Sequence, residues 1–132
     1  MMRVALGIGC DRDTPAATIA QAVDAALLQA GADASAVGIV ASIDLKADEA
    51  GLLEFVAARG WRIQFYPAKE LAKVAVPNPS EIVRKHTGTP SVSEAAALLA
   101  AATDMSQLLV EKFKLRGPDG RNATISIARI AP

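Results

Sequence analysis

The sequence predicts an α/β fold, a single three-layer α/β/α domain with a mixed sheet over residues 1–132. Short apolar runs typical of buried strands alternate with segments whose apolar residues recur every three or four positions, as in helices that pack on a sheet. Two strand-like segments then follow without a helix between them. The chain is 52% hydrophobic but only 4% aromatic, so we expect a core of closely packed aliphatic side chains.

The N-terminal part has the order of a βαβαβ unit. Its expected strands are residues 3–9, 37–43 and 61–66. Thr14 is placed to cap the first helix, with Pro15 at the first helical position. Gly31 and Gly60 are placed to end the first and second helices in the left-handed conformation. The second helix is expected to bury Leu45, Leu52, Leu53, Phe55 and Val56.

Three further helix starts are marked by proline or by a capping side chain. Pro67 can open a short helix that runs through residue 73. Asn78 is placed to cap another helix that starts at Pro79. Ser91, with Glu94 three residues later, has the pattern of a capping box in front of an alanine-rich helix.

The C-terminal part predicts a β-hairpin. Its expected strands are residues 107–115 and 122–130, joined by a connection rich in turn residues. Because side chains alternate along a strand, Lys112 and Lys114 would lie on the same face as Leu108 and Val110. The two lysines either are solvated residues of an edge strand or present two ammonium groups to a ligand.

Composition and charge exclude several classes of protein. Fourteen basic residues balance fourteen acidic ones, which argues against nucleic-acid binding. Cys10 is the only cysteine, so a reducing, cytoplasmic location is expected. No segment has the pattern of a signal peptide or the length of a membrane span. With one cysteine and one histidine we expect no metal site and no cofactor, and a dinucleotide fingerprint would need glycine at Arg12.

The residues that carry chemistry follow strands or begin helices. The carboxyl ends of strands in an α/β sheet meet at one edge, so we expect these residues to surround one crevice. The expected ligand-binding residues are Gly7, Gly9, Cys10, Arg12, Ser42, Asp44, Lys46, Glu49, Asn78, Ser80, Ser91, Glu94, Lys112 and Lys114.

Two of these positions have both a structural and a functional interpretation. Cys10 either fills a tight loop or is a nucleophile whose pKa is lowered by the following helix end, where amides of the first loop would receive an anion. Lys46 lies in the expected first turn of a helix, where its positive charge interacts unfavourably with the helix dipole. Either a neighbouring acid or a bound anion would compensate this charge. Asp44, Asp48 and Glu49 are all explained by capping and by the dipole.

Six motifs in series resemble the CobE family, which is equivalent to the C-terminal domain of the cobalamin-biosynthesis protein CbiG. They are residues 7–10, 41–46 with Glu49, 78–81, 91–98, Lys112 with Lys114, and 123–129. The resemblance extends over nearly the whole chain. It departs after Cys10, where Asp11, Arg12 and Asp13 replace the two arginines and the glycine that are frequent in the family.

The resemblance implies a role in making the corrin ring of vitamin B12. The expected partner is a polycarboxylate tetrapyrrole of the precorrin type, together with other enzymes of that pathway. The chain would assist or perform a ring-forming step, as a domain related to cobalt-precorrin-5A hydrolase. Cys10, Asp44 or Glu49 would then act as base or nucleophile. The alternative is a non-catalytic carrier that holds corrinoid intermediates between enzymes.

Overall fold

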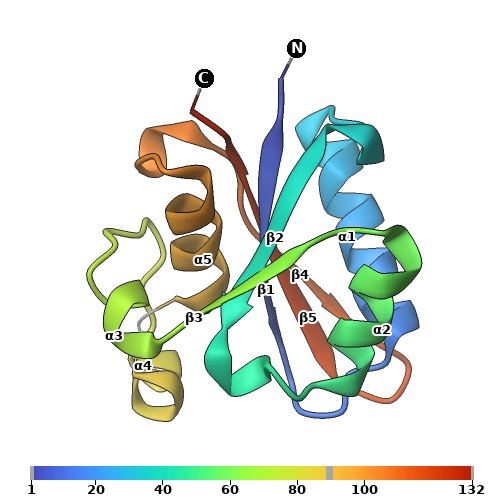
Figure 1. Cartoon of the computed structure of the whole chain (residues 1–132). Helices are drawn as coiled ribbons and strands as arrows, with labels where there is room; N and C mark the ends of the chain where they lie inside the picture. Colours follow the sequence, from blue (N-terminus) through green and yellow to red (C-terminus); the bar gives the residue numbers. More distant parts are fainter. Residues whose placement is uncertain (1, 89–90, 132) are drawn as a thin grey trace.

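A five-stranded mixed sheet lies between two layers of helices (Figure 1). The computed structural model describes residues 2–88 and 91–131, apart from the side chain of His86. The α-helices are α1 (Ala16–Ala30), α2 (Ala50–Arg59), α3 (Ala68–Leu71), α4 (Glu81–Thr87) and α5 (Val92–Ala101). Helices α1 and α2 cover one face of the sheet, while α3, α4 and α5 lie on the other. The α/β class predicted from the sequence is confirmed.

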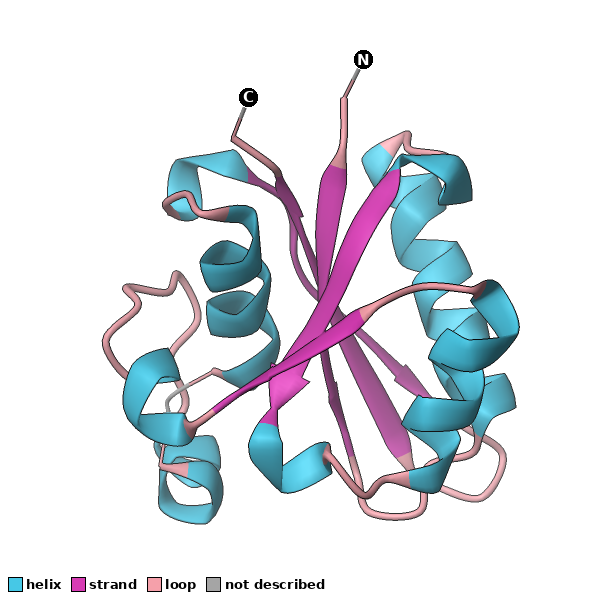
Figure 2. Cartoon of the chain, in the orientation of Figure 1, coloured by secondary structure: helices cyan, strands magenta, loops and turns pink. Residues whose placement is uncertain are grey.

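The strand order is β3-β2-β1-β5-β4, and the sheet is mixed (Figure 2). The strands are β1 (Val4–Cys10), β2 (Val37–Ile43), β3 (Ile63–Tyr66), β4 (Leu108–Arg116) and β5 (Asn122–Arg129). Strands β1, β2 and β3 are parallel, whereas β5 runs antiparallel between β1 and β4. The expected N-terminal βαβαβ unit and C-terminal hairpin are therefore both present.

Small residues let α5 approach the sheet closely. A Cβ atom built on Gly7 of β1 would lie 1.9 Å from the carbonyl oxygen of Ser93 and 2.7 Å from the backbone nitrogen of Ala97. Only glycine fits beneath the helix at this position, since contacts of this length do not occur between real Cβ atoms and backbone atoms. Larger aliphatic side chains, including Leu6, Ile8, Ile125 and Ile127, fill the opposite face beneath α1.

The predicted start of the second helix was wrong. A 3-10 helix at Asp44–Lys46 comes first, and α2 begins only at Ala50. Lys46 is therefore in the last turn of a 3-10 helix, where a cation does not oppose the dipole. Leu45 is 51% exposed and Leu53 38% exposed, so the two do not belong to the core as expected. The left-handed glycine ends predicted for α1 and α2 are confirmed.

Three predicted caps also differ from the structure. Pro15, and not Thr14, precedes the first helical residue, and the Thr14 hydroxyl donates to the carbonyl oxygen of Asp11. The Oγ atom of Ser80, and not Asn78, caps α4 by accepting a hydrogen bond from the N–H of Val83. Ser91 precedes α5 but makes no side-chain capping bond, so the capping box is absent.

Two register irregularities in β4 change which face its side chains occupy. They lie between Leu108 and Val110 and between Val110 and Phe113. Each extra residue reverses the alternation. Val110 consequently packs in the α1-side core, whereas Leu108 packs on the α5 side. The expectation that Val110 shares a face with Lys112 and Lys114 was wrong.

No helix in the described part of the chain is long and apolar enough to cross a membrane.

Candidate functional site

A cavity of about 780 Å³ lies where β1 and β2 end, beside α4 and the start of α5. This is the lower end of the molecule in Figure 1, opposite the two termini. Of the expected ligand-binding residues, the cavity is lined by Gly9, Cys10, Arg12, Lys46, Ser80, Ser91, Lys112 and Lys114. Ligand sites of α/β proteins occupy this end of a sheet.

The expected residues Gly7, Ser42, Asp44, Glu49, Asn78 and Glu94 do not line the cavity. Gly7 lies beneath α5. Ser42 is buried and donates a 2.6 Å hydrogen bond to the carbonyl oxygen of Ile8, which ties β2 to β1. Asp44 is exposed on the 3-10 helix that follows β2.

Glu49 fixes the loop after β1. Its carboxylate is only 2% exposed and accepts hydrogen bonds from Nη1 of Arg12 at 2.9 Å and from the N–H of Asp13 at 2.6 Å. Asp13 has a φ of 65°, which is rare for a residue other than glycine. The carboxylate of Glu49 thus occupies a place on the first loop that, in one of the two interpretations of this loop, an anionic ligand would take.

Asn78 joins α5 to β4 beside the cavity. Its Nδ2 donates to Oε2 of the buried Glu94 at 2.6 Å and to Oε1 of Glu111 at 3.1 Å. Its carbonyl oxygen accepts a hydrogen bond from Nζ of Lys112 at 3.3 Å. These contacts explain why Glu94 does not turn back to cap its own helix, and they hold Lys112 at the cavity.

The cavity is lined by four cations, Arg12, Lys46, Lys112 and Lys114, and by one carboxylate, that of Asp11. Arg12 is paired with Asp48 and Glu49, and its guanidinium lowers the pKa of Asp48 through a hydrogen bond. Within the described residues, Lys46 and Lys114 form no ion pair with a carboxylate. Unpaired cations gathered in one cleft attract anionic ligands.

Apolar side chains border these cations. Leu45 is 51% exposed and Ile82 72% exposed, and both line the cavity with Ile43, Val83 and Val92. Sequence reasoning missed Ile82 as a site residue and placed Leu45 in the core. The signal that could have identified Ile82 is its size and place in the sequence. It is a large apolar residue in the first turn of a short helix, and such a helix offers little surface against which an isoleucine side chain can pack.

Cys10 lines the cavity as a thiol. Its pKa is raised from 9.0 to about 11, chiefly by burial and in spite of the lowering by the nearby ammonium of Lys46. Of the two interpretations of Cys10, this direction favours a residue that fills a tight loop over a nucleophile whose pKa is lowered by the following helix end. A thiol with such a pKa is a weak nucleophile at neutral pH.

In the described part of the chain, no three histidine, cysteine, aspartate or glutamate side chains lie close enough together to hold a metal ion.

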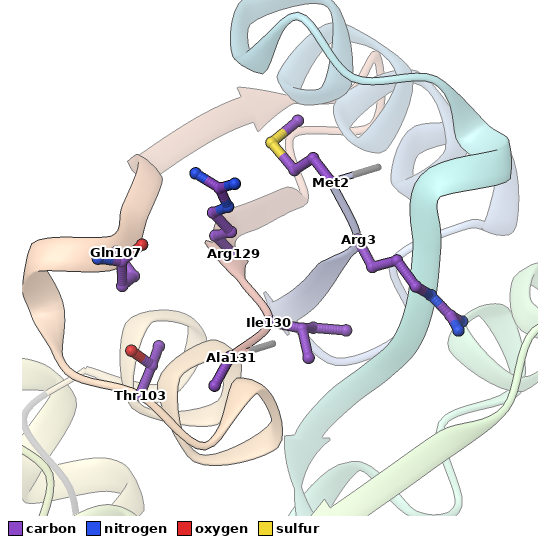
Figure 3. A pocket seen from close by; sticks show the side chains of 7 residues that line it. All are labelled: Met2, Arg3, Thr103, Gln107, Arg129, Ile130 and Ala131. Atoms are coloured by element: carbon purple, nitrogen blue, oxygen red, sulfur yellow. The ribbon is translucent and has the colours of Figure 1, made fainter.

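A second pocket, of about 390 Å³, lies at the other end of the sheet (Figure 3). It is lined by Met2, Arg3, Thr103, Gln107, Arg129, Ile130 and Ala131. Figure 3 shows the guanidinium of Arg3 directed toward β2 and away from Arg129. The two cations do not converge, so the cavity beside α4 and α5 is the better candidate for a functional site.

Comparison with known proteins identifies the family. The family described as Cobalamin synthesis G C-terminus matches residues 4–128. Protein CobE of Sinorhizobium sp is 37% identical over 110 residues, which are 82% of this chain and 71% of that protein. Cobalt-precorrin-5A hydrolase of Priestia megaterium is 36% identical over 127 residues, covering 96% of this chain. The chain spans only 32% of that hydrolase.

Solved structures agree with this result. The crystal structure of CobE, a protein from the cobalamin biosynthetic pathway, matches with a TM-score of 0.83 at 30% identity, covering 98% of this chain and 92% of that one. The cobalamin biosynthesis protein chiG from Agrobacterium tumefaciens matches at 32% identity and a TM-score of 0.67, covering 98% and 99%. The chain therefore belongs to the CobE family, which is the family of the CbiG C-terminal domain in cobalamin biosynthesis.

Proposed function

We propose that this chain binds a precorrin-type tetrapyrrole in the cavity beside α4 and α5 and assists or performs a step of corrin ring formation. The observation that carries this proposal is the placement of three lysines, Lys46, Lys112 and Lys114, and two exposed apolar side chains, Leu45 and Ile82, around one cavity. Precorrins combine an apolar ring with many acetate and propionate groups, so both kinds of surface have a counterpart in the ligand.

The charges favour a ligand with several carboxylates. One exposed contact between opposite charges contributes only about 0–1 kcal/mol. A ligand that engages Lys46, Lys112 and Lys114 together gains several such contacts while losing its translational freedom once. A monocarboxylate would gain much less from the same cavity.

The apolar rim favours a ring. Leu45 and Ile82 come from different segments, the 3-10 helix after β2 and helix α4, and both expose most of their surface. Burying apolar surface contributes roughly 25 cal/mol for each Å². A macrocycle face laid against these side chains would supply binding energy that the charges alone do not.

The same site also favours the alternative function, a carrier that performs no chemistry. Glu49 is engaged with Arg12 and Asp13, Asp44 does not line the cavity, and Cys10 is held as a thiol. Of the three candidate bases or nucleophiles, Glu49 is therefore engaged, Asp44 lies outside the cavity lining and Cys10 is protonated. The catalytic groups of the longer hydrolases would then belong to the part of their sequence that this chain does not span.

A titration with cobalt-precorrin-5A, followed by absorbance and mass spectrometry, tests the proposal. A saturable absorbance change with unchanged ligand mass supports a carrier, and a change of ligand mass supports an enzyme. An absorbance spectrum that does not change at any protein concentration would overturn both.

The Lys46→Ala variant tests the site itself. We expect its dissociation constant to rise about twofold to fivefold with no loss of thermal stability, because Lys46 forms no ion pair that folding would lose. Lys73→Ala, which removes an exposed lysine outside the cavity, is the matched control for the change in net charge. Equal affinities of the two variants would exclude Lys46 from the site.

A further inference from the structure

Ser91 is the one buried side chain in the described part of the chain whose polar atom lacks a hydrogen-bond partner. The residue is 1% exposed and lines the cavity. Buried hydroxyl groups in folded proteins are almost always paired, and an unpaired one lowers stability. The position therefore calls for an explanation beyond packing.

The usual role of such a serine is not fulfilled here. A serine before a helix normally accepts a hydrogen bond from the second or third N–H of that helix. Ser91 makes no such bond, and Glu94, which would complete a capping box, accepts instead from the backbone N–H and Nδ2 of Asn78. The hydroxyl can thus rotate toward the cavity without breaking an existing hydrogen bond.

The start of α5 offers further donors. The first backbone bond that closes this ten-residue helix runs from the N–H of Ala95 to the carbonyl oxygen of Ser91. Among the described residues, the N–H groups of Val92 and Ser93 have no acceptor. Both residues line the cavity, and the helix dipole favours a negative charge at this end.

We propose that the hydroxyl of Ser91 and the N–H groups of Val92 and Ser93 form a subsite for one carboxylate of the ligand. The hydroxyl would donate to one carboxylate oxygen and the amides to the other, while Lys112 and Lys114 on the same cavity supply positive charge. This inference rests on the proposed function, in which the carboxylate is an acid side chain of the tetrapyrrole. It assigns to Ser91 the binding of ligand in place of the capping of α5.

Two ligands test the subsite, glutarate as an isolated dicarboxylate and cobalt-precorrin-5A as the whole ligand. In amide-resolved NMR of the wild-type protein, glutarate should shift the Val92 and Ser93 signals in a saturable way. Ser91→Ala should weaken glutarate binding at least fivefold and cobalt-precorrin-5A binding about tenfold, because a hydrogen bond to a charged group is lost. Inorganic phosphate that shifts the same signals at lower concentration than glutarate would overturn the assignment to a carboxylate.

Thermal stability separates this role from capping. Ser91→Ala should leave the melting temperature of the free protein unchanged or raise it, since no bond is lost. Ser80→Ala, which removes a working cap of α4, should lower it. A melting temperature that falls as far for Ser91→Ala as for Ser80→Ala would show a structural role and overturn the proposal.

The two proposals can fail separately. If glutarate shifts the NMR signals of Val92 and Ser93 but cobalt-precorrin-5A does not bind, the subsite is retained and the proposed function is rejected. Binding of cobalt-precorrin-5A that is equal in wild type and Ser91→Ala, with unmoved signals of Val92 and Ser93, would reject the subsite alone.

Discussion

Glu49 and Arg12 are joined by a 2.9 Å hydrogen bond across 37 residues of chain, and this contact sets the shape of the loop that borders the cavity. The same carboxylate accepts a hydrogen bond from the N–H of Asp13, whose backbone is in the left-handed conformation. Gly51 lets the two segments meet, because a Cβ atom there would lie 2.1 Å from the carbonyl oxygen of Thr14. The first loop and the start of α2 thus form one unit.

Replacing Glu49 by glutamine should reduce stability. One of its two hydrogen bonds would become a contact between two donors in a buried place, which costs about 1–3 kcal/mol. The urea midpoint should fall accordingly. Asp48→Asn removes the exposed partner of the same arginine and should leave the midpoint nearly unchanged. Equal midpoints for the two variants would show that Glu49 does not fix the loop, and its assignment as a base would regain support.

The raised pKa of Cys10 predicts a loss of stability at alkaline pH. The unfolded thiol ionises near its ordinary pKa of 9.0, whereas the folded thiol does so only at about 11. The contribution of this thiol is therefore complete below pH 9 and is lost as the pH rises from 9 to 11. The wild type should lose up to about 2 kcal/mol more than Cys10→Ala across this range. Urea unfolding of both proteins from pH 8 to 11 checks this, and parallel curves would contradict it.

Gly7 and Gly9 should respond differently to substitution by alanine. At Gly7 the new methyl group would overlap the backbone of α5, so we expect a loss of about 3 kcal/mol or more. At Gly9 the nearest side-chain atoms, those of Val92, lie at an ordinary 3.9 Å, so Gly9→Ala should remain folded. Thermal unfolding monitored by circular dichroism compares the two. A stable Gly7→Ala protein would mean that α5 can move off the sheet.

Asn78→Asp should destabilise the protein at neutral pH and less so in acid. The new carboxylate would face those of Glu94 and Glu111, both of which now accept from the Asn78 amide. Close like charges favour the protonated form, so the folded-state pKa of the new group would be raised and its stability deficit would grow as the pH rises. Thermal unfolding of wild type and variant at pH 4.5 and pH 7 measures this. A difference that is independent of pH would argue that Asn78 acts only through packing.

The sequence allowed the fold to be predicted more fully than the site. Apolar periodicity located all five strands, and Gly31 and Gly60 marked the helix ends, because these signals are local. The contacts of Glu49 and Asn78 could not be predicted in this way, since each depends on which distant segment the fold brings near. Ser91 and Glu94 have the local pattern of a capping box, and here a tertiary contact with Asn78 replaced it.

The same limit applies to Lys46. Its importance was inferred from an unfavourable position in a helix, but the helix begins four residues later at Ala50. Its place at the cavity follows from the 3-10 helix at Asp44–Lys46, which the sequence pattern did not reveal. Lys46 thus lines the cavity although its predicted local structure was wrong.

The face of the sheet on which the lysines of β4 lie depends on whether the number of register irregularities before them is even or odd, and β4 has two. Each irregularity reverses the two sides of the strand, so the pair together leave Lys112 and Lys114 on the side that Leu108 occupies. An odd number of insertions or deletions between Leu108 and Lys112 would send both ammonium groups to the side of α1, whereas an even number would return them. Homologues that vary in length here should therefore differ by two residues and not by one if they keep these cations.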